Sequence, residues 1–202
     1  MPIECAPRIA SLVPSLTELM VALCLRDHLV ARTGFCVHPK EALQNVPKVG
    51  GTKDVNLSKL RALAPTHVLV NVDENTADCA ALLREFVPHV VVTHPCSAHD
   101  NLALLDEMLA LFGALPGVAE RVFKLKSELK AALEAVQAQR WPARRVLYLI
   151  WRDPWMTVAQ DTYISAMLAL VNWQTWPPHP GGEHGAARYP VVQGDEPWLA
   201  GI

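Results

Sequence analysis

The sequence predicts an α/β protein in which two lobes, each with a parallel sheet, are joined by one long helix. Three observations predict this fold class. Short β-branched runs alternate with helical patterns over the first 95 residues, a single apolar stripe at helical spacing follows, and a smaller group of strand-like and helical runs comes last. We expect an N-terminal lobe at 8–95, a helical connection at 96–142 and a C-terminal lobe at 143–202.

Four buried strands are predicted in the first lobe, because each run is short, β-branched and bounded by turn residues. They are Arg8–Val13, His28–Arg32, His67–Val72 and His89–Thr93. Helical patterns lie between them at Leu16–Leu25, Leu57–Leu63 and Thr76–Phe86. This alternation favours a parallel sheet with crossover helices.

Two helices are predicted in the connection. Ser97 with Asp100 forms a capping-box pattern at the start of the first. Pro116 is well placed to begin the second, whose apolar stripe runs over 118–136 and which we expect to end near Gln139. At ~1.5 Å per residue this helix would be ~35 Å long, enough to join two lobes.

The second lobe has about half as many elements as the first. Arg145–Trp151 and Trp155–Val158 are predicted strands, and Asp161 is the expected cap of a helix that ends at Val171. The Pro- and Gly-rich stretch 176–185 is predicted to be loop.

Composition excludes several classes of protein. A net charge of −2 offers no basic face for nucleic acid. No window approaches the ~18 apolar residues of a membrane-spanning helix, and the N-terminus shows no signal peptide. Five cysteines without a C-x-x-C pair indicate reduced thiols, for which cytoplasmic residence is the plain interpretation. We expect a monomer.

One wall of a binding cleft is predicted in the first lobe. Ser15 or Thr17 can accept hydrogen bonds from the first free amides of a helix, and Glu18 suits its positive end. The stretches 33–39 and 47–52 contain turns where the backbone can approach a ligand closely, although Gly34, Gly50 and Gly51 also suit ordinary turns.

The stretch Trp151-Arg152-Asp153-Pro154-Trp155 is the strongest signal in the second lobe. Two tryptophans beside an arginine, at the end of an apolar strand, form an amphipathic platform for a flat and partly polar ligand. The alternative is that Trp151 belongs to the core and Arg152 pairs with Asp153.

No catalytic constellation is found, so we expect no enzymatic activity, no resident metal and no intrinsic cofactor. His179, Glu183 and His184 lie on a Gly/Pro loop that fixes no ligand geometry, and a solvated loop is the simpler interpretation. Cys36 and His38 are two residues apart and lack an orienting third group, which argues against a nucleophile pair. His38 could instead stack on a macrocycle or bind a metal.

Five stretches together resemble the substrate-binding proteins of ABC importers for vitamin B12, haem and iron–siderophores. They are Ser11–Glu18, Gly34–Pro39, Pro47–Gly51, Leu63–Val70 and Tyr148–Met156. The resemblance covers almost the whole chain, and the corrinoid-binding branch looks most similar. It implies two α/β lobes joined by a rigid backbone helix, with the second lobe incomplete here because family members continue further.

The resemblance also implies which residues bind a flat ligand between the lobes. The expected first-lobe contacts are Pro14, Ser15, Phe35, His38, Gly50, Gly51, Val72 and Asp73. The expected second-lobe contacts are Trp151, Arg152, Trp155 and Tyr189. The acidic residues expected to dock on an ABC permease are Glu74 or Asp78 in one lobe and Asp195 or Glu196 in the other.

The function that follows is capture of a corrinoid (cobalamin or cobinamide), or of a related chelate such as haem or an iron–siderophore, for import. Val72 stands where corrinoid binders can have tryptophan, and His38 where tyrosine is usual, so the ligand can differ. The resemblance implies a periplasmic location, whereas the absence of a visible signal peptide leaves the cytoplasm open. Three alternatives stay open: a cytosolic chelate-handling protein, an enzyme binding a small phosphorylated substrate at Ser15 and Thr17, and a shortened product without a competent cleft.

Overall fold

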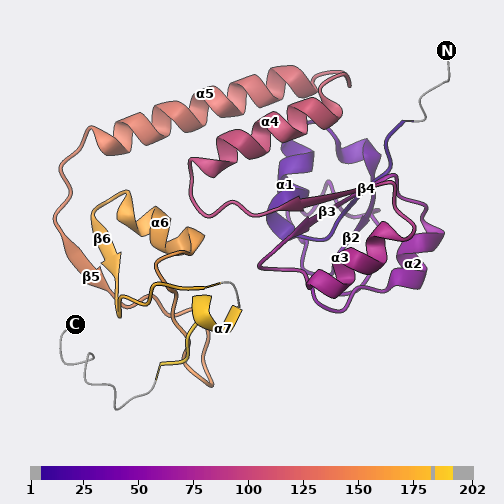
Figure 1. The fold of residues 1–202 in the computed structure, drawn as a ribbon. Helices are drawn as coiled ribbons and strands as arrows, with labels where there is room; N and C mark the ends of the chain where they lie inside the picture. The colour runs from indigo at the N-terminus through magenta and orange to yellow at the C-terminus, as the bar shows by residue number, and fades with distance from the viewer. Residues whose placement is uncertain (1–5, 183–184, 193–202) are drawn as a thin grey trace. The chain divides into compact units, whose positions relative to one another are not determined.

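The computed structural model describes residues 6–182 and 185–192, which fall into two compact units (Figure 1). Unit 1 comprises the chain up to His94 together with Met108–Phe123. Unit 2 comprises Pro95–Glu107 and the chain from Lys124 onward. Each unit is an α/β structure, as the sequence predicts, and each is described by itself below.

Unit 1 is built on a four-stranded parallel sheet with the order β2-β1-β3-β4. Its strands are β1 (Ile9–Ser11), β2 (Leu29–Arg32), β3 (His67–Asn71) and β4 (His89–Thr93). Its crossover helices are α1 (Pro14–Ala22), α2 (Leu57–Ala62) and α3 (Ala77–Arg84), and a short 3-10 helix spans Arg26–His28. All four predicted strands and all three predicted helices are confirmed. The strand β4 has the predicted bounds, α1 begins two residues before its predicted start and ends three residues before its predicted end, and the other elements are slightly shorter than predicted.

The core of unit 1 explains why the strands are so apolar. Ala10, Val68 and Val70 are buried in the sheet, against Leu60 of α2 and Leu83 of α3. Helices on the sheet exclude water, so the strands need no polar positions. The β-branched runs that identified the strands in the sequence are therefore the residues that form this core.

The amino edge of the same sheet contains a pair of stacked histidines. His67 of β3 and His89 of β4 are direct cross-strand partners, with ring centroids 4.6 Å apart. Phe112 packs edge-on against His67 at 5.1 Å. Burial, and secondarily the charge of His89, lower the pKa of His67.

Two long helices follow, α4 (Asp100–Phe112) and α5 (Val118–Gln137), and both contribute residues to each unit. The predicted capping box is confirmed in part, since the Asp100 amide donates to Ser97 Oγ at 3.3 Å. The helices lie side by side in Figure 1. Lys126 of α5 forms an ion pair with Asp106 of α4. The 20 residues of α5 make it about 30 Å long, shorter than predicted because it ends at Gln137.

Unit 2 contains a two-stranded parallel sheet of β5 (Arg144–Val146) and β6 (Trp173–Thr175), with α6 (Tyr163–Ala169) between them. The predicted strands over 145–151 and 155–158 are wrong in extent: after β5 only isolated bridges remain there, such as Trp151 with Met156. The strand β6 was not predicted, and α7 (Gly185–Arg188) begins at the end of the predicted loop.

The cap of α6 also differs from the expectation. Thr162, rather than Asp161, accepts from the Ser165 amide, at 3.3 Å. Asp161 instead accepts from the Gly182 amide at 3.0 Å, so its carboxylate fastens the Gly/Pro-rich loop to the start of α6. A side chain at Gly181 would overlap this carboxylate, and the φ of +96° there also favours glycine.

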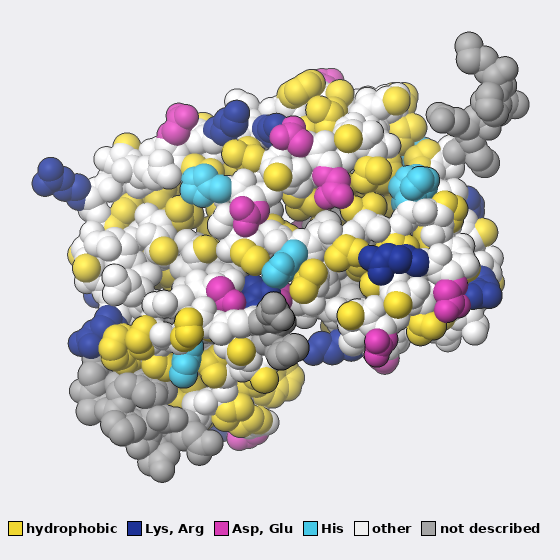
Figure 2. Space-filling model, viewed as in Figure 1, with side chains coloured by type: hydrophobic (Ala, Val, Ile, Leu, Met, Phe, Trp, Pro, Cys, Tyr) yellow, Lys and Arg dark blue, Asp and Glu magenta, His cyan; other side chains and the backbone are white. Residues whose placement is uncertain are grey.

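None of the helices in the described part of the chain combines the length and the apolar character needed to cross a membrane. On the face drawn in Figure 2, basic and acidic side chains are interspersed rather than gathered by sign.

Candidate functional site

The carboxyl ends of three strands of unit 1, β1, β2 and β3, bring the predicted first-lobe residues to one edge of the sheet. We call this set the sheet-edge surface: Pro14, Ser15, Phe35, His38, Gly50, Gly51, Val72 and Asp73. Three contacts link the loops that contain it. The Gly34 amide donates to Gly50 O at 2.7 Å, Asn75 Nδ2 to Thr52 O at 2.7 Å, and the Cys36 thiol to Ser11 O at 3.8 Å. Ligands of parallel α/β sheets bind at such an edge.

The start of α1 differs from the predicted cap. Val13 is the N-cap residue and no side chain caps the helix. The buried Thr17 hydroxyl lies 2.8 Å from Ser11 Oγ and 2.9 Å from Val13 O, inside the protein. The expectation that Thr17 faces a ligand is therefore wrong, whereas Ser15 is exposed. This removes one of the two hydroxyls on which the phosphorylated-substrate alternative was based.

The loop after β2 presents Phe35 and His38 to solvent. Phe35 is 64% exposed, which is unusual for so large an apolar side chain and excludes the interpretation that it belongs to the core. Between them, Cys36 is fully buried and its Sγ lies 3.1 Å from Thr33 Oγ1. A buried thiol beside an exposed imidazole cannot form a nucleophile pair, in agreement with the sequence analysis.

Gly50 and Gly51 are needed by the turn itself. A Cβ at Gly50 would lie 2.4 Å from Asp54 O, and φ is +102° there. A Cβ at Gly51 would lie 2.1 Å from Asp54 Oδ1 and 3.4 Å from Phe35 Cε2. The internal geometry of the turn thus accounts for both glycines, and the same geometry places the turn against Phe35.

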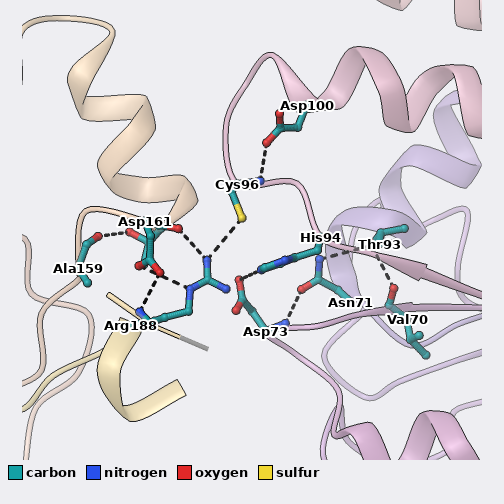
Figure 3. A network of polar contacts seen from close by, with 12 residues as sticks. Val70, Asn71, Asp73, Thr93, His94, Cys96, Asp100, Ala159, Asp161 and Arg188 are labelled. Carbon is teal, nitrogen blue, oxygen red and sulfur yellow. Dashed lines mark hydrogen bonds and ion pairs between the residues drawn. The ribbon is translucent and has the colours of Figure 1, made fainter. Parts of the chain in front are cut away.

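The ends of β3 and β4 form a polar network at the same edge (Figure 3). Asn71 Oδ1 accepts from the Asp73 amide at 2.9 Å, and Asn71 Nδ2 donates to Thr93 Oγ1 at 3.4 Å. His94 Nε2 lies 3.7 Å from Asp73 Oδ2, with both side chains partly exposed. Beside them Val72 is half-exposed. His94 was missed in the sequence analysis, although its position directly after the fourth strand was a usable signal.

Three of the four predicted second-lobe residues, Trp151, Arg152 and Trp155, lie on one hairpin of unit 2, which we call the tryptophan hairpin (residues 150–156). The Ile150 amide donates to Met156 O at 2.9 Å and the Met156 amide to Trp151 O at 3.1 Å. Trp151 is 64% exposed and Trp155 47% exposed. The Arg152 guanidinium carbon lies 5.8 Å from the centre of the Trp155 ring. The alternative that Trp151 belongs to the core is therefore wrong.

Tyr189 lies on the segment next to this hairpin. The Thr157 amide donates to Pro190 O at 2.9 Å and the Val192 amide to Trp155 O at 2.7 Å, so main-chain bonds fix the segment on both sides of the hairpin end. Just before Tyr189, the Arg188 side chain is buried.

Arg188 connects three parts of unit 2 (Figure 3). Its Nη2 donates to Asp161 O at 2.9 Å and approaches Cys96 Sγ at 3.6 Å, and its Nε lies 3.8 Å from Asp161 Oδ1. The sequence analysis missed this role, because nothing in the local pattern distinguishes Arg188 from a surface arginine.

The remaining predicted residues were not expected to contact the ligand. Glu74 and Asp78 are exposed at the start of α3. Asp195 and Glu196 lie outside the described residues, as do Glu183 and His184. Within the described ranges no group of three His, Cys, Asp or Glu side chains is arranged to hold a metal ion. Two surface hollows, of about 430 Å³ against α2 and about 200 Å³ between α6 and β6, contain none of the predicted residues.

Residues 9–188 match the model of the periplasmic binding protein family, and the chain belongs to this family. It is 27% identical to a vitamin B12-binding protein of Vibrio cholerae, over 82% of this chain and 59% of that protein. It is 28% identical to the ABC transporter substrate-binding lipoprotein YvrC of Bacillus subtilis, over 82% of this chain and 54% of that protein. The chain thus spans little more than half the length of these relatives.

Solved structures show the same fold. The periplasmic vitamin B12 binding protein BtuF of Vibrio cholerae superposes with a TM-score of 0.78 at 24% identity, over 93% of this chain and 71% of that chain. The periplasmic heme-binding protein RhuT of Roseiflexus sp. RS-1 gives 0.74 at 19% identity, over 94% and 71%. These structures confirm the predicted fold class, and the match to the family model confirms the predicted family.

Proposed function

We propose that the protein is the solute-binding component of an ABC-type importer, and that it binds a flat metal chelate of the corrinoid type through the exposed aromatic side chains of the sheet-edge surface and of the tryptophan hairpin. The observation on which the proposal depends is the exposure of Phe35, Trp151 and Trp155. Large aromatic side chains cost free energy when they face water, and they are typical of surfaces that stack on a ring. The names of the B12-binding relatives support the same ligand class.

Binding would need no chemistry from the protein. Phe35 and the tryptophans would cover the faces of the macrocycle, while Arg152 and His94 would meet its polar side chains. A non-enzymatic role agrees with a family of binding proteins. The compartment we propose is the periplasm or the outer face of a membrane, which recovery of the protein from a periplasmic fraction would test.

The experiment is a titration of the 202-residue chain with cyanocobalamin, followed by calorimetry and by the visible spectrum, with haemin in parallel. We expect heat and a spectral change on addition of cyanocobalamin, together with a rise in the thermal unfolding midpoint, because a ligand that binds only the folded state stabilises it. A folded protein that responds to neither chelate, also when extended at its C-terminus to the length of its relatives, would contradict the proposal.

We further propose that Glu74 or Asp78 docks on the permease, since both side chains are exposed, Glu74 just before α3 and Asp78 in its first turn. Replacing both by lysine should abolish stimulation of the cognate transporter's ATPase in proteoliposomes and leave the affinity for the chelate within about twofold. Glu107→Lys, an exposed acidic residue on α4, is the control and should stimulate normally. Equal loss in the control would show that overall charge, rather than docking, is responsible.

A further inference from the structure

We propose that Arg32 is a positioning residue, whose buried guanidinium holds the loop 33–46 in the conformation that presents Phe35 and His38. The inference that Arg32 orders the loop does not depend on the proposed function. The inference that this ordering raises the affinity for the chelate rests on the proposed function.

The contacts of Arg32 concentrate on this loop. Its Nη1 donates to Cys36 O at 2.8 Å and to Thr33 O at 3.4 Å, and its Nη2 donates to Leu43 O at 3.2 Å. Cys36 follows Phe35 directly, and Cys36 and Leu43 flank the segment 37–42 that contains His38, so one guanidinium joins the two ends of this segment. Such a planar fork of donors is a property of arginine that lysine lacks.

The same residue also connects the loop to the sheet. The Arg32 amide donates to Pro47 O and the Val49 amide donates to Arg32 O, both at 2.9 Å. Arg32 ends β2 opposite Ser11 of β1. The side chain and main chain of one residue thus fasten the loop to β1 and to the segment that leads to Gly50 and Gly51.

Burying the Arg32 guanidinium costs free energy, because the charged group loses its contacts with water. This cost argues that the side chain has a structural role. The residue is 7% exposed, and its Nε finds no hydrogen-bond partner among the described residues. No ion pair between described residues includes it. A buried cation without a carboxylate is compensated only by the carbonyl oxygens it contacts, and here all of these belong to one loop.

A second arginine acts on the same loop. Arg26 Nε donates to Ala42 O, next to the Leu43 carbonyl that Arg32 contacts. The loop is 14 residues long and contains no helix or strand, but it is anchored by buried Leu43 and Val46. A loop ordered before the ligand arrives loses less entropy on binding.

The test compares Arg32→Gln and Arg32→Lys with Arg8→Gln. Arg8 is a matched control, because its guanidinium also donates to two main-chain carbonyls, those of Leu63 and Ala64, but at the amino end of β1. In the ligand-free proteins, hydrogen exchange of peptides covering 33–46 should accelerate at least tenfold in both Arg32 variants and less than twofold in Arg8→Gln. Trypsin cleavage after the exposed Lys40 should accelerate in parallel.

With cyanocobalamin as probe, both Arg32 variants should raise Kd at least fivefold and Arg8→Gln less than twofold. Should Arg32→Gln fail to fold, Arg26→Gln removes a single bond to the loop and should still accelerate its exchange about threefold. Unchanged exchange of 33–46 in the Arg32 variants, or a lysine variant that behaves like the wild type, would overturn the proposal. Absence of chelate binding by the wild type would refute the proposed function and leave the exchange experiment decisive for Arg32.

Discussion

The two candidate surfaces are built in different ways. The sheet-edge surface belongs to the unit with four parallel strands, and side chains hold its loops: Arg32 bonds to Leu43 O within the loop 33–46, and Asn75 bonds to Thr52 O in a neighbouring loop. The tryptophan hairpin stands beside a two-stranded sheet and is fixed mainly by main-chain bonds to the segment 190–192. Exposed aromatic side chains are therefore positioned in two ways here, by loops with several side-chain hydrogen bonds in unit 1 and by one hairpin with main-chain hydrogen bonds in unit 2.

This difference predicts unequal stability in the two units. Leu69 is fully buried in the middle of the four-stranded sheet, so Leu69→Ala should lower the free energy of unfolding of unit 1 by about 3 kcal/mol. Leu133→Ala, which truncates a leucine on α5 in unit 2, should cost less, about 2 kcal/mol, because that side chain is not completely buried.

The chain offers separate probes for this experiment. All six tryptophans follow residue 140, so fluorescence reports unit 2, whereas far-UV circular dichroism reports both units. We expect Leu69→Ala to shift the dichroism transition in urea more than the fluorescence transition. Identical shifts of both transitions would show that the two units unfold together, and the prediction that the units differ in stability would then be wrong.

The two surfaces can also be compared through binding. Trp151→Ala should raise the Kd for cyanocobalamin roughly tenfold, or about 1.4 kcal/mol, because it removes the larger ring. Phe35→Ala should raise it about fivefold. Both are measured by calorimetric titration against Phe123→Ala, which removes an aromatic side chain of similar exposure (61%) on α5.

Only the control should leave the affinity unchanged. Loss in Trp151→Ala alone would assign binding to the hairpin, and loss in Phe35→Ala alone would assign it to the sheet edge. Equal loss in Phe123→Ala would mean that exposed aromatics act through stability and would contradict the assignment to either surface.

The same contrast explains how much could be predicted. In unit 1 the strands β1, β2 and β3 are largely buried on both faces, and the edge strand β4 has the β-branched run Val90–Val92, so all four strands are explicit in the sequence. The loops at the carboxyl ends of these strands could be placed from the topology. In unit 2, β6 is a strand of three residues with Trp173, Gln174 and Thr175, which shows neither a β-branched run nor alternation long enough to recognise.

Individual side chains were less predictable than elements. Thr17 has the spacing of a capping residue, but its hydroxyl forms hydrogen bonds with Ser11 Oγ and Val13 O. A sequence pattern alone does not reveal these competing partners. Arg32 and Arg188 are functional candidates only because folding buries them against distant carbonyls. A charged residue at the end of an apolar strand was a visible signal for Arg32, whereas Arg188 had none.

The smallest expected effect is a pH dependence of stability that arises at the amino edge of the sheet in unit 1, opposite the sheet-edge surface. The pKa of His67 is lowered from 6.5 by burial and by His89, so folding favours the neutral imidazole. Stability from this site is complete above pH ~6.5 and is lost as the pH falls through that value towards the lowered pKa of the folded state. Thermal unfolding between pH 7.5 and 5.5 should show the loss, and His67→Gln should reduce it.

His99→Gln provides the control, because it removes a histidine that does not belong to the stacked pair, and the comparison with His67→Gln shows whether the effect is specific to the pair. Affinity for the chelate should follow a different profile, since the stacked histidines begin β3 and β4 whereas the sheet-edge surface lies where these strands end. Parallel profiles of stability and affinity, altered together by His67→Gln, would show that the two edges are coupled. In that case the loops of the sheet-edge surface would depend on the packing at the opposite end of the same strands.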